Sequence, residues 1–395
     1  MLFEALTRHA QTRPGAVAAV CGESRLTWVQ WRDQALHQAA SLPAAGVIPL
    51  QFRNSQALLV ALLACAYQQR TALLLPADCT TSERDRLLAA AQPGSFLLLP
   101  TSGTTGQPKL IPRSQAQLAT LGAAFNTAAQ ITGDDRIFCA VPLAHGYGLC
   151  AGLLAALFSG ASLYLQEKFD RRQLLRALPS AGITVLAAAP FQYNVLAATV
   201  MPEPLEVPRL RLALSGGAPL PSDLWSRARH RLGFPIRQTY GTSETGMITA
   251  NVHGDPEATH TSVGHPLPGV SVAIVDGIIA VRDAVNPAAP WIYTDDLGHL
   301  DNAGRLHISG RRQDLFNIGG RKFHPAEVEA VLRAHPLVRH ATVERLQSPS
   351  GEDTHKAIVV CEAPCTPEEI VAFCRERLAP HKVPRLIEVS DRQRP

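Results

Sequence analysis

A stretch of glycine and hydroxyl residues followed by a lysine is the first feature of this sequence that could do chemistry. Residues 97–114 read LLLPTSGTTGQPKLIPRS, so an apolar run ends at Pro100 and six Ser, Thr and Gly residues precede Lys109. Glycines let consecutive backbone N–H groups turn inward around an anion, and the hydroxyls and the lysine add donors and positive charge. The GxxxxGK[ST] spacing of a Walker A loop is missing, because Gly103 and Gly106 are three apart. We predict a phosphate-binding loop of another kind, with a plain flexible turn as the alternative.

Two further loops of similar character follow later in the chain, each after a short apolar run. Residues 238–246 read QTYGTSETG and residues 215–220 read SGGAPL. Tyr240 could offer a flat surface to a purine ring, and Glu244 is a hard oxygen ligand suited to a Mg²⁺ ion that carries nucleotide phosphates. The alternatives are a packed tyrosine, a solvated carboxylate and a tight turn. Since ligands of parallel α/β sheets bind at the carboxyl ends of strands, we expect the three loops to converge on one crevice.

Two charged motifs in the last third of the chain could bind a sugar. Residues 293–298 read YTDDLG and residues 309–314 read SGRRQD. An aspartate can accept hydrogen bonds from both hydroxyls of a ribose, and an arginine can donate to the same sugar or to a phosphate. The alternative is a charged turn with a surface salt bridge.

The elements that must position these motifs alternate between apolar strands and helices. From about residue 95 we predict strands at residues 96–100, 136–141, 162–166, 185–189, 211–215 and 236–240. Between them we predict helices at residues 115–130, 149–158, 170–178 and 222–232. This alternation predicts an α/β fold, with a large N-terminal domain whose parallel sheets are covered by helices.

The pattern changes after about residue 265. Short β-like runs separated by glycine and Asp-Asn turns predict a small antiparallel β unit. Helices at residues 325–335 and 366–378, together with strands at residues 338–346 and 357–361, then predict a small, mobile α+β C-terminal domain. We place the domains at residues 1–310 and 311–395.

Composition excludes several classes of function. The 395 residues are 46% hydrophobic and 18% charged, and the net charge of +4 is spread without a dense Lys/Arg run. We therefore expect neither nucleic-acid nor membrane-surface binding. Eight scattered cysteines without a CxxC pair are typical of reduced thiols. The N-terminus has no apolar core of signal-peptide length, and glycines and serines interrupt the longest apolar stretch, so we expect a cytoplasmic protein.

Taken in order, five motifs resemble those of the acyl- and aryl-adenylate-forming superfamily, which includes acyl-CoA synthetases, peptide-synthetase adenylation domains and luciferases. The motifs are TSGTTGQPK, SGGAPL, YGTSETG, YTDDLG and GRRQDLFNIGGRKFHPAEVE. Residues 109–113 (KLIPR) and 142–145 (PLAH) resemble those of stand-alone aryl-acid–AMP ligases. The resemblance implies a ligase of secondary metabolite biosynthesis. A carboxylate would attack the α-phosphate of ATP to give an acyl-adenylate and pyrophosphate, and a thiol would then displace AMP.

The resemblance implies ATP and Mg²⁺ as cofactors and a small carboxylic acid as substrate. The acceptor would be coenzyme A or the phosphopantetheine of an acyl or aryl carrier protein, and the aryl-acid-like motifs favour the carrier protein.

The resemblance also assigns roles to single residues. Those that would hold the β- and γ-phosphates are Thr101, Ser102, Gly103, Thr104, Thr105, Gly106 and Lys109. Those that would line the adenine are Gly217, Ala218 and Tyr240, those that would bind the ribose are Asp296 and Arg311, and Gly241 would also belong to the nucleotide site. The implied catalytic residues are His145 over the carboxylate, Ser243 at the α-phosphate and Glu244 as the Mg²⁺ ligand. Those that would line the acid pocket are His145, Gly146, Ala189 and Gly216. Asp314 would be the hinge of the small domain.

The sequence departs from the family pattern at its C-terminus. The family's adenylation step uses a lysine in that region, and here no lysine follows Lys382. We expect the natural chain to continue beyond Pro395 to a catalytic lysine. The alternative is a nucleotide-binding member of the same fold with weak or no ligase activity.

The acid pocket departs from the pattern as well. Gly146 stands where dihydroxybenzoate ligases carry an asparagine for the ortho hydroxyl, and residues 142–152 contain no aspartate for an α-amino group. We therefore expect an aromatic acid without an ortho hydroxyl, of the hydroxybenzoate or cinnamate kind, with a medium-length acyl acid second.

Overall fold

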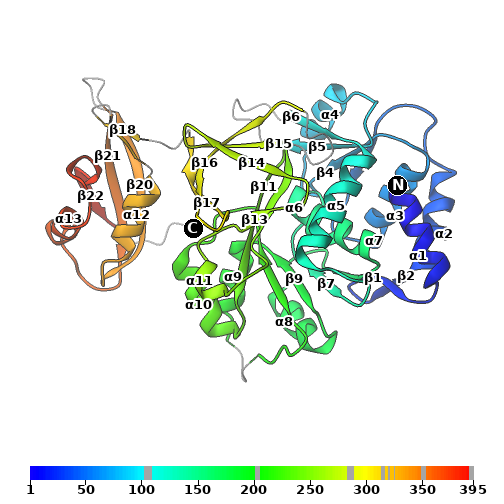
Figure 1. The fold of residues 1–395 in the computed structure, drawn as a ribbon, viewed down its shortest axis with the longest axis horizontal. Helices are drawn as coiled ribbons and strands as arrows, with labels where there is room; N and C mark the ends of the chain where they lie inside the picture. The colour runs from blue at the N-terminus through cyan, green and yellow to red at the C-terminus, as the bar shows by residue number, and fades with distance from the viewer. Residues whose placement is uncertain are drawn as a thin grey trace. The chain divides into compact units, whose positions relative to one another are not determined.

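The chain forms two compact units in the computed structural model, which describes residues 1–101, 109–200, 205–282, 289–312, 316–318, 321–323, 325–347 and 353–390 (Figure 1). The first unit comprises Met1–Ala273, Ala280–Ile292 and Leu300–His307. The second comprises Ile274–Ile279, Tyr293–His299 and Ile308–Pro395. The domain boundary between residues 310 and 311 stays a prediction, and the expected hinge, Asp314, lies outside the described residues.

A large sheet, called here the main sheet, forms the centre of the first unit. In the described part of the chain its order is β13-β12-β11-β10-β9-β7-β8-β1-β2. The strands are β1 (Val17–Cys21), β2 (Ser24–Thr27), β7 (Arg136–Cys139), β8 (Ser162–Leu165), β9 (Val185–Ala188), β10 (Leu212–Ser215), β11 (Ile236–Thr242), β12 (Gly246–Ala250) and β13 (His265–Pro266). Pairing is parallel from β11 to β1 and antiparallel at both edges. The predicted α/β class with a parallel sheet is confirmed.

A second sheet of the first unit carries the predicted phosphate loop. Its strands are β3 (Ile48–Gln51), β4 (Ala72–Leu75) and β5 (Leu97–Thr101), which are parallel, and β6 (Lys109–Arg113), which is antiparallel to β5. The sequence predicted β5 but not β6, which contains Pro112. The structure places β6 at the edge of this second sheet, where a proline is tolerated because only one side of the strand is paired.

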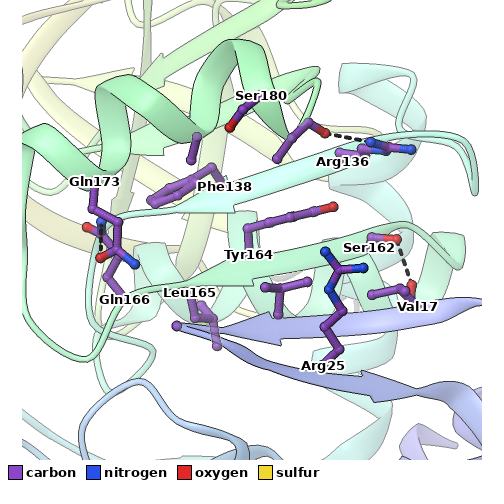
Figure 2. Close-up of a pocket in the computed structure, with 14 residues that line it drawn as sticks. Val17, Arg25, Arg136, Phe138, Ser162, Tyr164, Leu165, Gln166, Gln173 and Ser180 are labelled. Atoms are coloured by element: carbon purple, nitrogen blue, oxygen red, sulfur yellow. Dashed lines mark hydrogen bonds between the residues drawn. The ribbon is translucent and has the colours of Figure 1, made fainter.

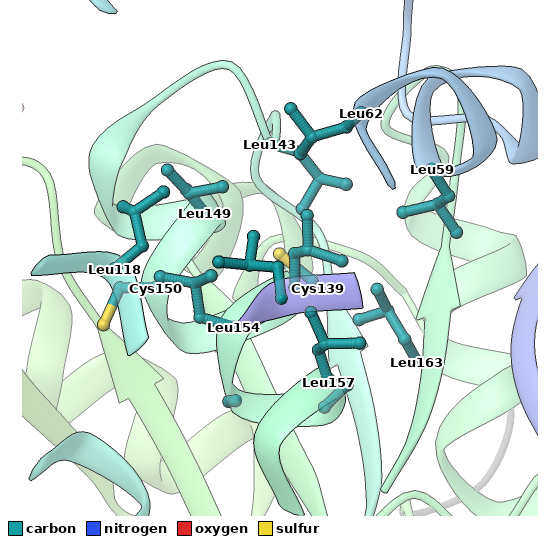
Figure 3. Close-up of a cluster of buried hydrophobic side chains, with 14 of the residues drawn as sticks. Leu59, Leu62, Leu118, Cys139, Leu143, Leu149, Cys150, Leu154, Leu157 and Leu163 are labelled. Carbon is teal, nitrogen blue, oxygen red and sulfur yellow. The ribbon is translucent and has the colours of Figure 1, made fainter. Parts of the chain in front are cut away.

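Helices pack on both faces of the main sheet because successive side chains of a strand point to opposite faces. Leu212 and Leu214 of β10 join one core, and Ala213 joins another. The first core, part of which is shown in Figure 3, includes α1 (Leu2–Thr12), α2 (Trp28–Ala39), α3 (Gln56–Tyr67), α5 (Gln115–Ala129) and α7 (Ala155–Ser159). The second includes α8 (Arg171–Ser180), α9 (Pro190–Ala197) and α10 (Ser222–Leu232). Every described helix is too short or too polar to span a bilayer.

The second unit has an α+β core of its own. The strands β20 (Val338–Gln347), β21 (Asp353–Cys361) and β22 (Leu386–Val389) form a sheet. The helices α12 (Pro325–Arg333) and α13 (Pro367–Arg375) bury Val328, Leu332, Ile370 and Cys374 in the same core as β20 and β21. Thr366 begins α13 as its N-cap, and Glu369 completes a capping box, which agrees with the predicted helix start.

Four strands in the described part of the chain form the predicted small β unit. Their order is β14 (Ser271–Val275), β15 (Ile278–Arg282), β16 (Ile292–Leu300) and β17 (Leu306–Arg311).

A buried carboxylate ties together the amino ends of three neighbouring strands of the main sheet. Asp135 precedes β7, Thr184 precedes β9 and Arg211 precedes β10. Asp135 is 5% exposed and accepts hydrogen bonds from Thr184 Oγ1 at 2.6 Å and from Arg211 Nε and Nη2 at 3.0 and 2.7 Å. Burial alone would raise the pKa of Asp135, but the hydrogen bonds from Arg211 and Thr184 outweigh burial and lower it. The ionised carboxylate therefore aligns β7, β9 and β10 at one end.

We expect Asp135→Asn to lower the free energy of unfolding at pH 7 by about 1–3 kcal/mol, the lower end reflecting the partial exposure of Arg211. The folded-state pKa of Asp135 lies below its unfolded value of about 3.9, so its stabilisation is present above that value and is lost as the pH falls through the folded pKa. Urea unfolding across this pH range measures the effect, with the exposed neighbour Asp134→Asn as the control. A difference between the two variants that does not shrink in acid would contradict this account.

Candidate functional site

Loops that carry the predicted site residues follow four neighbouring parallel strands of the main sheet. The order β11-β10-β9-β7 and the parallel pairing put the carboxyl ends of these strands at one edge. His145 follows β7 and Ala189 follows β9. Gly216 follows β10, and Tyr240 lies near the end of β11. The structure therefore brings together the predicted acid and adenine residues of the first unit.

The loop after β10 packs closely against the loop after β7. A Cβ atom at Gly216 would lie 2.5 Å from Thr239 Oγ1 and 3.0 Å from two ring carbons of Tyr147, so only glycine fits there without a shift of these neighbours. Gly217 has a φ of +83° and no heavy atom within 4 Å of an added Cβ, and Ala218 is exposed. Gly216 is thus packed tightly against Tyr147 and Thr239. Gly217 and Ala218, in contrast, face open space that a ligand could fill.

His145 lies at the start of a helical segment with an unusual hydrogen-bond pattern. The residue after it begins α6 (Gly146–Gly148), which continues into a π-helical turn, η1 (Leu149–Leu154), and then α7. The sequence predicted one α-helix over residues 149–158. Packing is close within this turn, because a Cβ at Gly152 would lie 2.7 Å from Cys139 Sγ. Single π turns are frequent at functional sites.

The surroundings of His145 favour the neutral form of its imidazole. His145 is exposed at the loop surface, but partial desolvation by the surrounding protein lowers its pKa, against an opposing effect of Asp78. A neutral imidazole can both donate and accept a hydrogen bond. Gly146, next to it, has no heavy atom within 4 Å of an added Cβ, so the space beside His145 is open.

Asn54, which sequence reasoning missed, fixes the loop that leads to His145. It follows β3 of the second sheet and is 6% exposed. Its Nδ2 donates to the Val141 carbonyl at 2.9 Å, and its Oδ1 accepts from the Leu143 backbone N–H at 2.8 Å. Both ends of the Asn54 amide form hydrogen bonds with a loop about ninety residues away in the sequence. No local sequence pattern could therefore identify Asn54 as a residue that fixes this loop.

Ser243 and Glu244 lie exposed in the turn between β11 and β12. A Cβ at Gly241 would lie 2.4 Å from the Gly246 carbonyl oxygen, so glycine is required for the two strands to approach each other. Tyr240 is 8% exposed, which leaves little of its ring accessible to a ligand. Its predicted contact with adenine stays a prediction.

Arg113 connects this turn to the predicted phosphate loop. Its Nη2 donates to the Ser243 and Glu244 carbonyls at 2.6 Å each. Arg113 ends β6, and Thr101 of β5 lies opposite Lys109 at the other end of the same hairpin. The predicted phosphate ligands between them, Ser102, Gly103, Thr104, Thr105 and Gly106, lie outside the described residues. The strands on either side nonetheless show that a hairpin carries this loop and that Arg113 links the hairpin to the turn of Glu244.

The two predicted ribose ligands belong to the second unit and lie next to each other. Arg311 Nε is 3.4 Å from Asp296 Oδ1, and Asp296 is mostly buried whereas Arg311 is exposed. Their proximity suits joint binding of a sugar, and it equally fits the surface salt bridge that the sequence left open. Their ribose contacts stay predictions.

Comparison with known proteins identifies the family. The model for AMP-binding enzymes matches residues 94–278, and the model for the C-terminal domain of AMP-binding enzymes matches residues 327–394. This chain belongs to the family of AMP-binding enzymes. The acyl-adenylate-forming superfamily predicted from the five motifs is thereby confirmed.

Relatives of this AMP-binding enzyme include CoA ligases. The 2-succinylbenzoate–CoA ligase of Bacillus licheniformis is 28% identical over an alignment of 463 positions. The alignment covers 98% of this chain and 95% of the relative. A 3-[(3aS,4S,7aS)-7a-methyl-1,5-dioxo-octahydro-1H-inden-4-yl]propanoyl:CoA ligase of Rhodococcus jostii is 31% identical over 340 residues, which cover 81% of this chain and 66% of the relative. These names agree with the predicted enzyme class, an AMP-forming acid–thiol ligase.

A solved structure supports the same conclusion about fold and cofactors. It is an O-succinylbenzoate coenzyme A synthetase from Bacillus subtilis in complex with ATP and magnesium ion. It superimposes with a TM-score of 0.82 at 26% identity and covers 98% of this chain and 96% of that one. The cofactors predicted from the sequence, ATP and Mg²⁺, are those bound in this relative.

We expect Arg113→Ala to weaken binding of the ATP–Mg²⁺ complex about tenfold or more, because the turn that carries Ser243 and Glu244 loses both hydrogen bonds from Arg113. Arg113→Lys should recover part of the loss, since lysine keeps the charge but not the planar guanidinium. Isothermal titration calorimetry measures both. The exposed Arg8→Ala variant is the control, and Arg113→Ala binding as tightly as Arg8→Ala would contradict the link.

Proposed function

We propose that this chain is an ATP-dependent, AMP-forming acid–thiol ligase that activates a small carboxylic acid and transfers it to coenzyme A. The observation that carries the proposal is the convergence of loops after β7, β9, β10 and β11 at one edge of the main sheet, with Arg113 joining the hairpin of TSGTTGQPK to the turn of Glu244. The family match and the names of the relatives support it.

In the first half-reaction an oxygen of the carboxylate would attack the α-phosphorus of ATP, and pyrophosphate would leave. Such a reaction is accelerated mainly by positioning and by neutralising charge on the phosphates. The hairpin loop with Lys109 would hold the β- and γ-phosphates, and Ser243 would contact the α-phosphate. His145, whose surroundings favour the neutral imidazole, would approach the substrate carboxylate without adding a second charge at the reacting centre. Arg113 would act through the turn and not by touching the nucleotide.

Glu244 suits a magnesium ion that is shared with the nucleotide. It is an exposed carboxylate on a turn fixed by Arg113. The described residues contain no cluster of three or more His, Cys, Asp or Glu side chains that could hold a metal by themselves. Mg²⁺ commonly takes one or two protein carboxylates and completes its shell with phosphate oxygens and water. When bound, the ion would neutralise charge on the phosphates.

In the second half-reaction a thiol would attack the acyl carbonyl, and AMP would leave. The relatives' names favour coenzyme A as the acceptor. The carrier protein favoured by the aryl-acid-like motifs stays a prediction, and parallel loading assays with the two acceptors distinguish them. Neither the relatives nor the geometry favours a nucleotide-binding protein without ligase activity.

The acid that fits best is aromatic and lacks an ortho hydroxyl. The open space at Gly146 leaves an ortho position without a hydrogen-bond partner from this residue. The name 2-succinylbenzoate–CoA ligase shows that a relative acts on an acid that contains a benzene ring. A medium-length acyl acid is the second candidate, and a screen of both classes for acid-dependent pyrophosphate exchange tests the proposal.

We expect Glu244→Ala to abolish acid-dependent pyrophosphate exchange, because the magnesium ion loses its protein carboxylate. The exposed loop variant Glu206→Ala, which removes the same side chain elsewhere in the first unit, should exchange like the unmodified protein. Exchange by Glu244→Ala at the rate of Glu206→Ala would overturn the magnesium assignment.

We expect Gly146→Asn to fold normally, because a Cβ at this position meets no atom, and to improve kcat/KM for an ortho-hydroxybenzoate relative to the unsubstituted benzoate. One hydrogen bond to the hydroxyl corresponds to about a tenfold change in this ratio. Gly146→Ala, which fills part of the space without adding an amide, is the matched control. An unchanged ratio in Gly146→Asn would show that residue 146 does not face the ortho position.

A further inference from the structure

A separate cavity of about 510 Å³ lies on the main sheet away from the loops described above (Figure 2). Its floor is formed by β7, β8 and β1, and its walls by α8 and by Arg25 of β2. Arg136 and Ser162 begin β7 and β8, so this end of the cavity lies at the amino ends of the strands, opposite to the edge that carries His145. Its volume is within the range of small-molecule sites.

The cavity exists because one face of β8 and β1 is only partly covered. Leu163 and Leu165 of β8 are buried in the first core, whereas Tyr164 between them is only half-buried on the other face. In β1, Ala19 is buried and Val20 is half-buried in the same way. Parallel strands normally have both faces covered, so this face leaves apolar and aromatic surface for a ligand to occupy.

The polar groups of the cavity favour an anion. The residues that line it include Arg25 and Arg136 but no aspartate or glutamate. Arg136 Nη1 donates a hydrogen bond to the Ala181 carbonyl at 2.6 Å, which orients the guanidinium of Arg136. Within the described residues, the side chains of Arg25 and Tyr164 make no hydrogen bond or ion pair with the protein. Figure 2 shows Arg25 reaching from β2 toward Tyr164.

The charges around the cavity are also arranged along its length. The nearest carboxylates in sequence, Glu23 and Glu167, follow Gly22 and Gln166 at the carboxyl ends of β1 and β8. Arg136 lies at the amino end of β7. Arg25 lies opposite Val20, near the carboxyl end of β1, so the two arginines approach the cavity from different ends and an anionic group would be attracted to the space between them.

We propose that this cavity binds a small molecule with a flat apolar body and one anionic group, a carboxylate or a phosphate ester. The body lies on Tyr164, Phe138 and Val20, where aromatic rings offer stacking surface. The anionic group lies between the guanidinium groups of Arg25 and Arg136, which form charge-assisted hydrogen bonds to either head group. This site is separate from the proposed acid site and does not depend on the proposed ligase activity.

Isothermal titration calorimetry of the full chain with 2-naphthoate, 2-naphthyl phosphate and the neutral 2-naphthamide tests the proposal. We expect at least one anion to bind with one-to-one stoichiometry at this cavity and the amide to bind at least about tenfold more weakly. Whichever anion binds more tightly identifies the head group.

Variants locate the binding. Arg25→Ala should weaken anion binding about tenfold, whereas Arg8→Ala, an exposed arginine that does not line the cavity, should leave it unchanged. Tyr164→Ala should weaken it as well, and circular dichroism checks that each variant is folded. Because an aromatic carboxylate could also enter the acid site, the titrations are repeated in Gly146→Trp, which fills the space beside His145.

Binding that survives Gly146→Trp and is lost in Arg25→Ala supports the proposal. It is overturned if neither anion binds, if the amide binds as tightly as the anions, or if Arg25→Ala binds like Arg8→Ala. Binding that is lost in Gly146→Trp but kept in Arg25→Ala would assign the ligand to the acid site and equally overturn it.

Discussion

The alignment of parallel strands in the main sheet is the constraint on which the candidate site depends. The residues proposed to contact acid and adenine in the first unit lie on loops that share no local sequence, and only the common direction of β7, β9, β10 and β11 places them at one edge. At the opposite ends Asp135 joins three of these strands through Thr184 and Arg211. A shift of one strand along its neighbour would break these hydrogen bonds and displace a loop at the other end.

The second sheet supplies two polar side chains that hold loops at the candidate site of the main sheet in place. Asn54, after β3, holds the segment before His145, and Arg113, at the end of β6, holds the turn of Ser243 and Glu244. Both links end on backbone groups, so they fix the path of the chain and leave the neighbouring side chains available to a ligand. Ser114, directly after Arg113, caps α5 with Gln117 and so fixes where β6 ends.

The same covering of strands by helices explains both the candidate site and the separate cavity. Where α9 and α10 pack on the main sheet, the strand faces are fully buried and only the loops at their ends are accessible. Where α8 leaves β8 and β1 partly uncovered, Tyr164 and Val20 remain half-exposed and the space between them and Arg25 is open. Arg25 and Arg136 line this space without an aspartate or glutamate among the lining residues, so the space favours an anionic ligand.

The sequence by itself determined the family, the α/β class and the loops that end the strands. These features depend on neighbouring residues, because strand period, helix caps and turn conformations are short-range properties. The need for glycine at Gly216, in contrast, comes from contacts with Tyr147 and Thr239 that only the tertiary structure shows. Tertiary structure alone decided which side chains hold the loops in place. Arg113 contacts residues 130 and 131 positions away and Asn54 contacts residues 87 and 89 positions away. The exposure of Tyr240, which is largely buried, likewise depends on how β11 packs and not on the motif around it, and its contact with a ligand stays a prediction.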